Sequence, residues 1–295
     1  MAVQEETFRH RPEPAGAVEL TGSAWRVTSP RATVVIAHGV NEHLGRYGGV
    51  VEALTGAGFS VVGHDHRGHG RSDGRRGHVD DFDDYARDLV ALFVREREIA
   101  PDAQVIALGH SMGGLIAARA ALLAQGESAQ DQLAALVLSS PALAIGGGMP
   151  EWQKRVFLVM GRYLGNLPTP PGKPGGLSRD PAVEEAFGQD PLNNLQRTRL
   201  RLVRQIYLAG EDARARAGEL RLPLLAMHGT ADTITDPAGS EAFVAGASST
   251  DKELRRWPDN RHEIFNDRDK AEALAYLVGW LEVRFPRVEE EGGGR

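Results

Sequence analysis

The chain contains no cysteine among its 295 residues. This absence excludes disulfide bonds, thiolate catalysis and metal sites that use cysteine ligands. No apolar run reaches the ~18 residues that a membrane-spanning helix needs. The opening segment MAVQEETFRH carries glutamates where a secretory signal peptide would need an apolar stretch. We therefore expect a cytoplasmic protein.

The charge balance is mildly acidic, with a formal net charge of -6, which argues against nucleic acid as the main partner. With 41% hydrophobic and 25% charged residues, the composition is that of an ordinary globular protein with enough chain for a large core. The tail 289–294 is three glutamates followed by three glycines, which predicts disorder.

Short apolar runs alternate with helical patterns along most of the chain. This rhythm predicts an α/β fold with a mostly parallel central sheet flanked by helices. The expected strands are 33–37, 59–63, 105–108, 135–138, 222–227 and, less regular, 254–257. The expected helices are 50–57, 82–98, one that directly follows Ser111, and 271–285.

Residues 142–221 interrupt this rhythm, because roughly 75 residues pass without a strand pattern, too long for an ordinary connection. The segment holds a Pro/Gly-rich stretch at 167–176 and a helical pattern near 195–209. We interpret it as a helical cap inserted into a core formed by 1–141 and 222–295. Its 12 Lys and Arg exceed its 8 Asp and Glu, so the expected cap is basic on an otherwise acidic protein.

The sequence GHSMG at 109–113 follows a predicted strand and precedes a predicted helix. This is the G-x-S-x-G pattern, in which a sharp strand–helix turn exposes a nucleophilic serine above the sheet. Gly109 and Gly113 are expected because a Cβ at either position would collide with neighbouring backbone in so tight a turn. Ser111 is therefore the candidate nucleophile; the alternative is an incidental serine in a Gly-rich junction.

A serine hydroxyl needs a base, usually a histidine that a carboxylate orients, and in this fold the order is Ser, Asp or Glu, then His. Downstream of Ser111 the sequence has two histidines, His228 and His262. We assign His262 as the base because His228 comes too early in its turn. Asp232 is the expected orienting carboxylate because it follows a strand in the first turn; the rival carboxylates are Asp236 and Asp259.

The oxyanion of such a reaction needs two backbone N–H donors. One is expected from Met112, next to the nucleophile, and the other from Val40, after the strand 33–37. His38 is more readily a structural hydrogen-bonding residue than a base. The three histidines of HDHRGH at 64–69 suit a metal in type, but their spacing and the surrounding glycines and arginines favour a packed loop, so we expect no metal.

Several motifs occur in one order: VVIAHGVNEHLGRY from residue 34, HDHRGHGRS from 64, LGHSMGG from 108, LSRDP from 177 and HGTAD from 228. Together they resemble the monoacylglycerol lipase and lysophospholipase branch of the α/β-hydrolase superfamily, especially its bacterial members. The resemblance covers most of the chain. One departure is Asn41, at a position where the family commonly has a small residue such as glycine.

This resemblance implies a cofactor-free serine ester hydrolase that cleaves single-chain lipid esters, above all monoacylglycerol. It also implies that Glu42 and Arg46 lie near the pocket for the glycerol end; the alternative is a structural ion pair. A lysophospholipase, a small-ester carboxylesterase, a peptidase or a lactonase uses the same triad. A catalytically silent hydrolase fold that only binds lipid is the alternative from another class.

The expected first cap helix carries apolar residues at helical spacing: Trp152, Val156, Met160, Tyr163, Leu164 and Leu167. Such a face lines an acyl tunnel, contacts a membrane or micelle surface transiently, or packs against the core. A cluster of arginines at 197–204 either attracts anionic lipid or forms a solvated face. The sequence does not indicate the oligomeric state.

Overall fold

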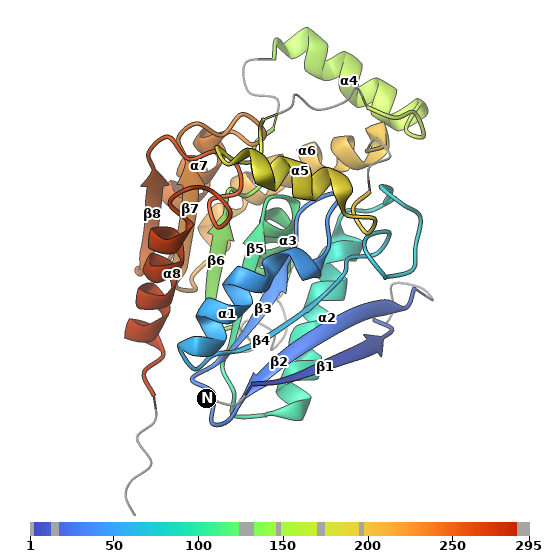
Figure 1. Cartoon of the computed structure of the whole chain (residues 1–295). Helices are drawn as coiled ribbons and strands as arrows, with labels where there is room; N and C mark the ends of the chain where they lie inside the picture. Colours follow the sequence, from blue (N-terminus) through green and yellow to red (C-terminus); the bar gives the residue numbers. More distant parts are fainter. Residues whose placement is uncertain are drawn as a thin grey trace, which may run out of the picture.

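A computed structural model describes residues 3–12, 18–123, 133–145, 149–169, 175–194 and 198–287. Eight strands form one sheet in the order β1-β2-β4-β3-β5-β6-β7-β8, with helices on both faces (Figure 1). The pairs from β4 to β8 are all parallel, whereas β1 and β2 pair antiparallel with each other and β2 pairs antiparallel with β4. The α/β-hydrolase fold expected from the sequence is confirmed.

The strands are β1 Val3–His10, β2 Leu20–Val27, β3 Thr33–Ala37, β4 Ser60–His64, β5 Val105–His110, β6 Ala135–Ser139, β7 Leu224–Gly229 and β8 Lys252–Trp257. The helices around them are α1 Gly48–Gly56, α2 Asp83–Ile99, α3 Met112–Leu123, α7 Pro237–Gly246 and α8 Lys270–Arg284. Between β6 and β7 lie α4 Glu151–Tyr163, α5 Pro181–Gln189 and α6 Leu200–Ala215. Short 3-10 turns occupy Leu44–Tyr47 and Ala217–Glu219.

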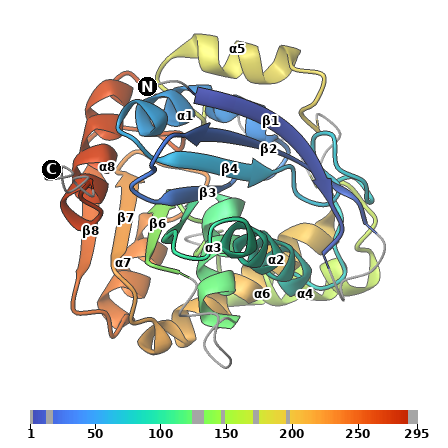
Figure 2. The same ribbon diagram turned by 90° about the horizontal axis from the view of Figure 1, so that it is seen from below.

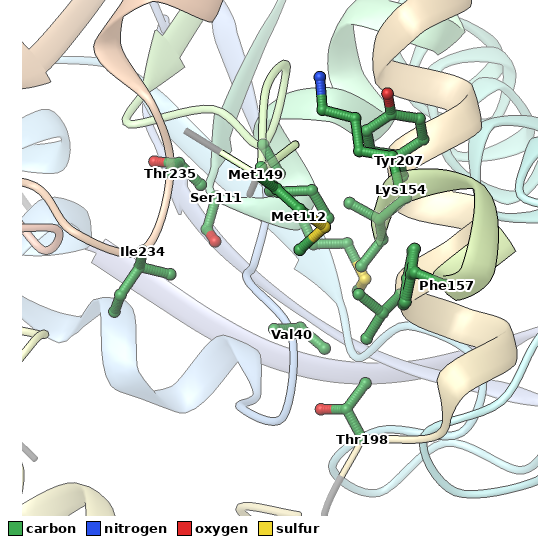
Figure 3. A pocket seen from close by; sticks show the side chains of 14 residues that line it. Val40, Ser111, Met112, Met149, Lys154, Phe157, Thr198, Tyr207, Ile234 and Thr235 are labelled. Atoms are coloured by element: carbon green, nitrogen blue, oxygen red, sulfur yellow. The ribbon is translucent and has the colours of Figure 1, made fainter. Parts of the chain in front are cut away.

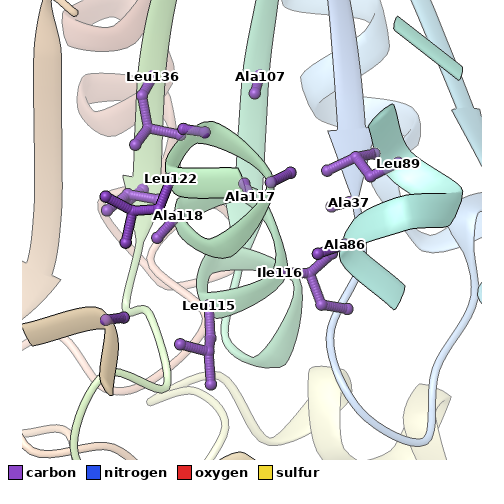
Figure 4. Close-up of a cluster of buried hydrophobic side chains, with 14 of the residues drawn as sticks. Ala37, Ala86, Leu89, Ala107, Leu115, Ile116, Ala117, Ala118, Leu122 and Leu136 are labelled. Atoms are coloured by element: carbon purple, nitrogen blue, oxygen red, sulfur yellow. The ribbon is translucent and has the colours of Figure 1, made fainter. Parts of the chain in front are cut away.

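Alternating side chains of the central strands divide the core into two layers. On one face, Val35 and Ala107 join the apolar residues of α2, α3, α6 and α7 (Figure 4). On the other, Val34 and Ile106 pack with α1 and α8. Figure 2 shows α1 and α8 on one side of the strands and α2 and α3 on the other. Because both faces are covered, the central strands are mostly apolar, which is why the sequence predicted them.

Two strands escaped sequence-based prediction. Most side chains of β1 are exposed, so its sequence shows no apolar pattern. Strand β2 contains Thr-Gly-Ser, which is typical of a turn. The short helices α5 and α7 were also missed, and α5 buries no side chain of its own.

The segment between β6 and β7 places its helices over one end of the sheet, with α4 outermost (Figure 1). Its third helix begins at Leu200, five residues later than predicted, and packs against α3. The glycines 146–148, the centre of the Pro/Gly-rich stretch, Arg197 and the acidic tail lie outside the described residues. Among the residues the structure describes, no helix is long and apolar enough to cross a membrane. The division into core and cap stays a prediction.

Candidate active site

Ser111 lies in the turn between β5 and α3, with a left-handed backbone (φ 55°). Its N–H donates to the carbonyl oxygen of Ser139 on the neighbouring strand, at 3.0 Å. A Cβ on Gly109 would collide with the backbone of Gly113, and one on Gly113 would collide with the backbone of Ala37. Both positions therefore require glycine, because the backbone segments lie too close for a Cβ. This close packing holds Ser111 in its strained conformation above the sheet.

His262 follows β8 and lies beside this serine. The Ser111 hydroxyl donates to His262 Nε2 at 2.8 Å, and His262 Nδ1 donates to Asp232 Oδ2 at 2.8 Å. Ser111 is 5% exposed and His262 3%, so bulk water has little access to the hydrogen bonds between them. The structure thus brings together the three residues that the sequence singled out, in the geometry of a nucleophile, a base and an orienting carboxylate.

The Asp232 carboxylate is surrounded by donors. Oδ1 accepts from the backbone N–H groups of Ile234 and Thr235, at 2.7 and 3.1 Å, and Oδ2 accepts from the Thr235 hydroxyl at 2.8 Å. Oδ2 also accepts from His228 Nε2 at 3.2 Å. Burial opposes ionisation, but the hydrogen bonds from His228 and His262 outweigh it and hold the pKa of Asp232 well below its usual range. The carboxylate is therefore charged at neutral pH.

The rival residues occupy other positions. Asp236 caps α7 by accepting from the N–H of Ala238 at 3.0 Å, and Asp259 lies exposed in the turn after β8. His228 belongs to β7, where its Nδ1 accepts from the Ser240 hydroxyl at 2.8 Å. Its Nε2 therefore contacts the same carboxylate oxygen as His262. The support that His228 and Thr235 give Asp232 was missed, because no spacing rule in the sequence indicates it.

Both predicted oxyanion donors line the same cavity as Ser111. Met112 is the first residue of α3, where N–H groups lack intrahelical partners, and Val40 follows β3. His38 positions this loop: its Nε2 accepts from the N–H of His66 at 2.9 Å, and its Nδ1 donates to the carbonyl oxygen of Gly39 at 2.7 Å. Burial lowers the pKa of His38, so the ring is neutral.

The histidines of the 64–69 loop have protein partners. His66 Nε2 lies 3.1 Å from the carbonyl oxygen of His38, and His69 Nδ1 lies 3.0 Å from that of Arg67. Burial lowers the pKa of His64, His66 and His69, which keeps all three rings neutral. Within the described ranges, no group of three or more His, Asp or Glu side chains is arranged to hold a metal ion.

Glu42 and Arg46 form hydrogen bonds with other residues of the protein and with each other. Arg46 donates to both oxygens of Glu263, at 2.8 and 2.9 Å, and to Glu42. Glu42 also accepts from the Tyr47 hydroxyl at 2.7 Å and from the N–H of Gly39. Burial opposes its ionisation, but Arg46 above all lowers the pKa of Glu42. This network ties the loop of residues 38–43, which we call the oxyanion loop after the predicted Val40 donor, to the loop that follows His262.

The cavity that borders Glu42 and Arg46 is small, with a volume of about 20 Å³. One water molecule needs ~10–15 Å³ of such volume, so the cavity has room for a water and not for a glycerol. In this conformation the geometry favours the structural alternative for Arg46. The role of the pair in substrate binding stays a prediction.

Arg46→Met tests the structural alternative. The change leaves the carboxylates of Glu42 and Glu263, each 4% exposed, without their cationic partner. We therefore expect it to lower the free energy of unfolding by ~3–5 kcal/mol in urea denaturation. The control is Arg87→Met: Arg87 pairs with Asp81 and Asp84 but is 41% exposed, so its loss should cost ~0–1 kcal/mol. Unchanged stability together with a raised KM would instead assign Arg46 to substrate binding.

A second cavity, of about 290 Å³, opens onto Ser111 and extends between α4 and α6 (Figure 3). Its walls are mostly apolar, and Lys154 and Tyr207 carry polar groups at one end of it. The lining residues are Val40, Ser111, Met112, Ala142, Ile145, Met149, Lys154, Phe157, Thr198, Val203, Ile206, Tyr207, Ile234 and Thr235. Such a slot beside a nucleophile accommodates an apolar chain on the acyl side of an ester.

Comparisons with known proteins agree with this geometry. The chain is 34% identical to the monoacylglycerol lipase of Mycolicibacterium smegmatis over 267 residues, which covers 90% of this chain and 94% of that protein. It is 32% identical to human monoglyceride lipase over 247 residues, or 82% and 79% of the two chains.

Among solved structures, the crystal structure of the Paleococcus ferrophilus monoacylglycerol lipase superposes with a TM-score of 0.77 at 30% identity. The match covers 96% of this chain and all of that one. Residues 28–269 match the Hydrolase_4 family, described as serine aminopeptidase, S33. The chain therefore belongs to the Hydrolase_4 family of serine hydrolases, within the α/β-hydrolase superfamily.

Proposed function

We propose that this enzyme hydrolyses single-chain lipid esters, with monoacylglycerol as the main substrate and glycerol and a fatty acid as products. The observation that carries the proposal is the apolar cavity of about 290 Å³ that Ser111 helps to line, which we call the acyl cavity. Its volume is near the lower limit of ~300–1,000 Å³ for ligand pockets, which suits one acyl chain better than two. The similarity to monoacylglycerol lipases supports the same substrate class.

The reaction follows from the order of the contacts. His262 takes the proton of Ser111 as the oxygen attacks the ester carbonyl, and Asp232 stabilises the resulting imidazolium. The N–H groups of Val40 and Met112 stabilise the oxyanion. His262 then gives the proton to the departing glycerol oxygen, which leaves an acyl-enzyme on Ser111. A water molecule, activated by the same histidine, releases the fatty acid and restores the hydroxyl.

Residues 142–221 act as a lid that contacts a lipid surface through α4. Seven apolar side chains on and after this helix are substantially exposed: Trp152, Val156, Val159, Met160, Tyr163, Leu164 and Leu167. Phe157, on the same helix, instead lines the acyl cavity. The excess of positive charge in this segment favours an anionic surface. The enzyme is then a peripheral, cytoplasmic protein that takes its substrate from a membrane or micelle.

A hydrolysis panel tests the proposal with purified protein. With one acyl chain held constant, we expect 1-monoacylglycerol to be cleaved faster than diacylglycerol or lysophosphatidylcholine. Faster cleavage of lysophosphatidylcholine would make the enzyme a lysophospholipase, and turnover of short p-nitrophenyl esters alone would make it a small-ester esterase.

The same panel, presented in anionic vesicles, tests the lid surface. Trp152→Ser should slow hydrolysis of vesicle-bound substrate and leave a water-soluble short ester unaffected, because the Trp152 side chain is 66% exposed. Equal rates of Trp152→Ser and the parent enzyme on vesicle-bound substrate would exclude the proposed surface contact of α4.

A further inference from the structure

Asn41 lies between Val40, the predicted oxyanion donor, and Glu42. Its backbone is left-handed (φ 63°), a conformation that asparagine tolerates better than most residues. Glycine would adopt the same conformation without any side chain. The backbone conformation therefore does not by itself require the asparagine side chain.

The Asn41 side chain bonds to the segment that leads into α6. Its Nδ2 donates to Thr198 Oγ1 at 2.7 Å, and its Oδ1 accepts from Asn194 Nδ2 at 3.3 Å. Its backbone carbonyl oxygen accepts from the N–H of Asn194 at 2.9 Å. Two residues on, His43 Nε2 lies 2.8 Å from Asp190 Oδ2. The oxyanion loop is thus attached to Asp190, Asn194 and Thr198.

Thr198 and Val40 both line the acyl cavity at Ser111. The bond between Asn41 and Thr198 therefore connects the cavity wall to the peptide that follows the Val40 donor. On the inner side, Glu42 accepts from the N–H of Gly39 and fixes the other end of the same loop. An oxyanion donor must lie within ~0.5 Å of its productive position. A loop fixed on both sides therefore keeps the Val40 N–H directed at the oxyanion.

We infer that Asn41 is a positioning residue that holds the oxyanion loop against the wall of the acyl cavity. The inference rests on the proposed ester hydrolysis at Ser111. Asn41 touches neither the reacting atoms nor the triad, so it acts through Val40. An interaction of this kind contributes to the transition state more than to ground-state binding.

Asn41→Gly is the direct test, because glycine keeps the left-handed backbone and removes only the side-chain bonds. We expect kcat on a soluble ester to fall about 10- to 100-fold, less than the ~10²- to 10³-fold cost of deleting an oxyanion donor. KM should change less than about threefold. Thr198→Val removes the same bond from its other side and should lower kcat in the same way. The kcat of the double variant should be no lower than that of the more affected single variant.

The control is Asp80→Ala, which removes the 3.0 Å ion pair of Asp80 with Arg201, another contact between the insertion and the core but away from the oxyanion loop. It should leave kcat unchanged. A kcat within twofold of the parent in Asn41→Gly, or additive effects of Asn41→Gly and Thr198→Val, would overturn the inference.

Amide hydrogen exchange of residues 38–47 separates this inference from the proposed function. Thr198→Val leaves that segment's sequence intact, yet it should accelerate exchange there, while Asp80→Ala should not. This result is expected even if the parent enzyme cleaves no ester, in which case the proposed function fails and the attachment of the loop stands. Unchanged exchange in Thr198→Val would overturn the attachment itself.

Discussion

Ser111→Ala is expected to reduce ester hydrolysis by at least ~10⁴-fold, because it removes the nucleophile and leaves the base without a proton to take. The loss falls on kcat, since the acyl cavity and the oxyanion donors remain and substrate still binds. The fold should survive: alanine keeps the Cβ, and the bonds of the Ser111 backbone to Ser139, Leu115 and Ala142 involve no side-chain atom. Initial rates and a thermal melt measure the two effects.

The matched control is Ser140→Ala, another buried serine with a left-handed backbone (φ 42°), close to the site. Its hydroxyl has no hydrogen-bond partner among the described residues, so its removal should change the rate less than about threefold. Near-normal hydrolysis by pure Ser111→Ala protein would exclude Ser111 as the nucleophile.

Asp232→Asn is expected to lower kcat by ~10⁴-fold while the protein remains folded. The carboxylate accepts from His262 Nδ1, and an amide presents a donor in that place, which favours the wrong tautomer of the imidazole. The amide NH₂ would also face His228 and the Thr235 hydroxyl, both of which donate to Asp232 Oδ2. The other oxygen keeps its bonds to the backbone of Ile234 and Thr235, so the turn is preserved.

Asp236→Asn is the control for this change, four residues along the chain. Asp236 caps α7, and asparagine caps a helix about equally well, so both rate and stability should stay near those of the parent. If Asp236→Asn abolished activity and Asp232→Asn did not, the orienting carboxylate would be Asp236 and the contact with His262 would be incidental.

The central strands and the nucleophile turn could be predicted from sequence because each has a strong physical cause. Strands β3, β5 and β6 are buried on both faces, which requires an apolar run, and the turn at Ser111 needs glycine at two fixed positions. Strand β1 has no such requirement, since it lies at the sheet edge with most side chains exposed. It therefore gave no pattern.

The site was predictable where spacing along the chain decides the contact. Asp232 and His262 each follow a strand, and the ends of parallel strands meet at one edge of the sheet. The sequence favoured Asp232 over Asp236 and Asp259 because Asp232 comes in the first turn after its strand. The bonds of His228 to Asp232 and of Asn41 to Thr198 were not foreseen, because each joins residues through side-chain directions that no periodicity encodes.

Labelling with a fluorophosphonate, read by intact mass and peptide mapping, tests whether Ser111 is an activated nucleophile. Such a probe reacts with a serine that a neighbouring base activates. We expect one adduct per chain, on Ser111, absent from Ser111→Ala and much slower to form in Asp232→Asn. No adduct on a folded, lipid-binding protein, or an adduct elsewhere while ester hydrolysis persists, would contradict it.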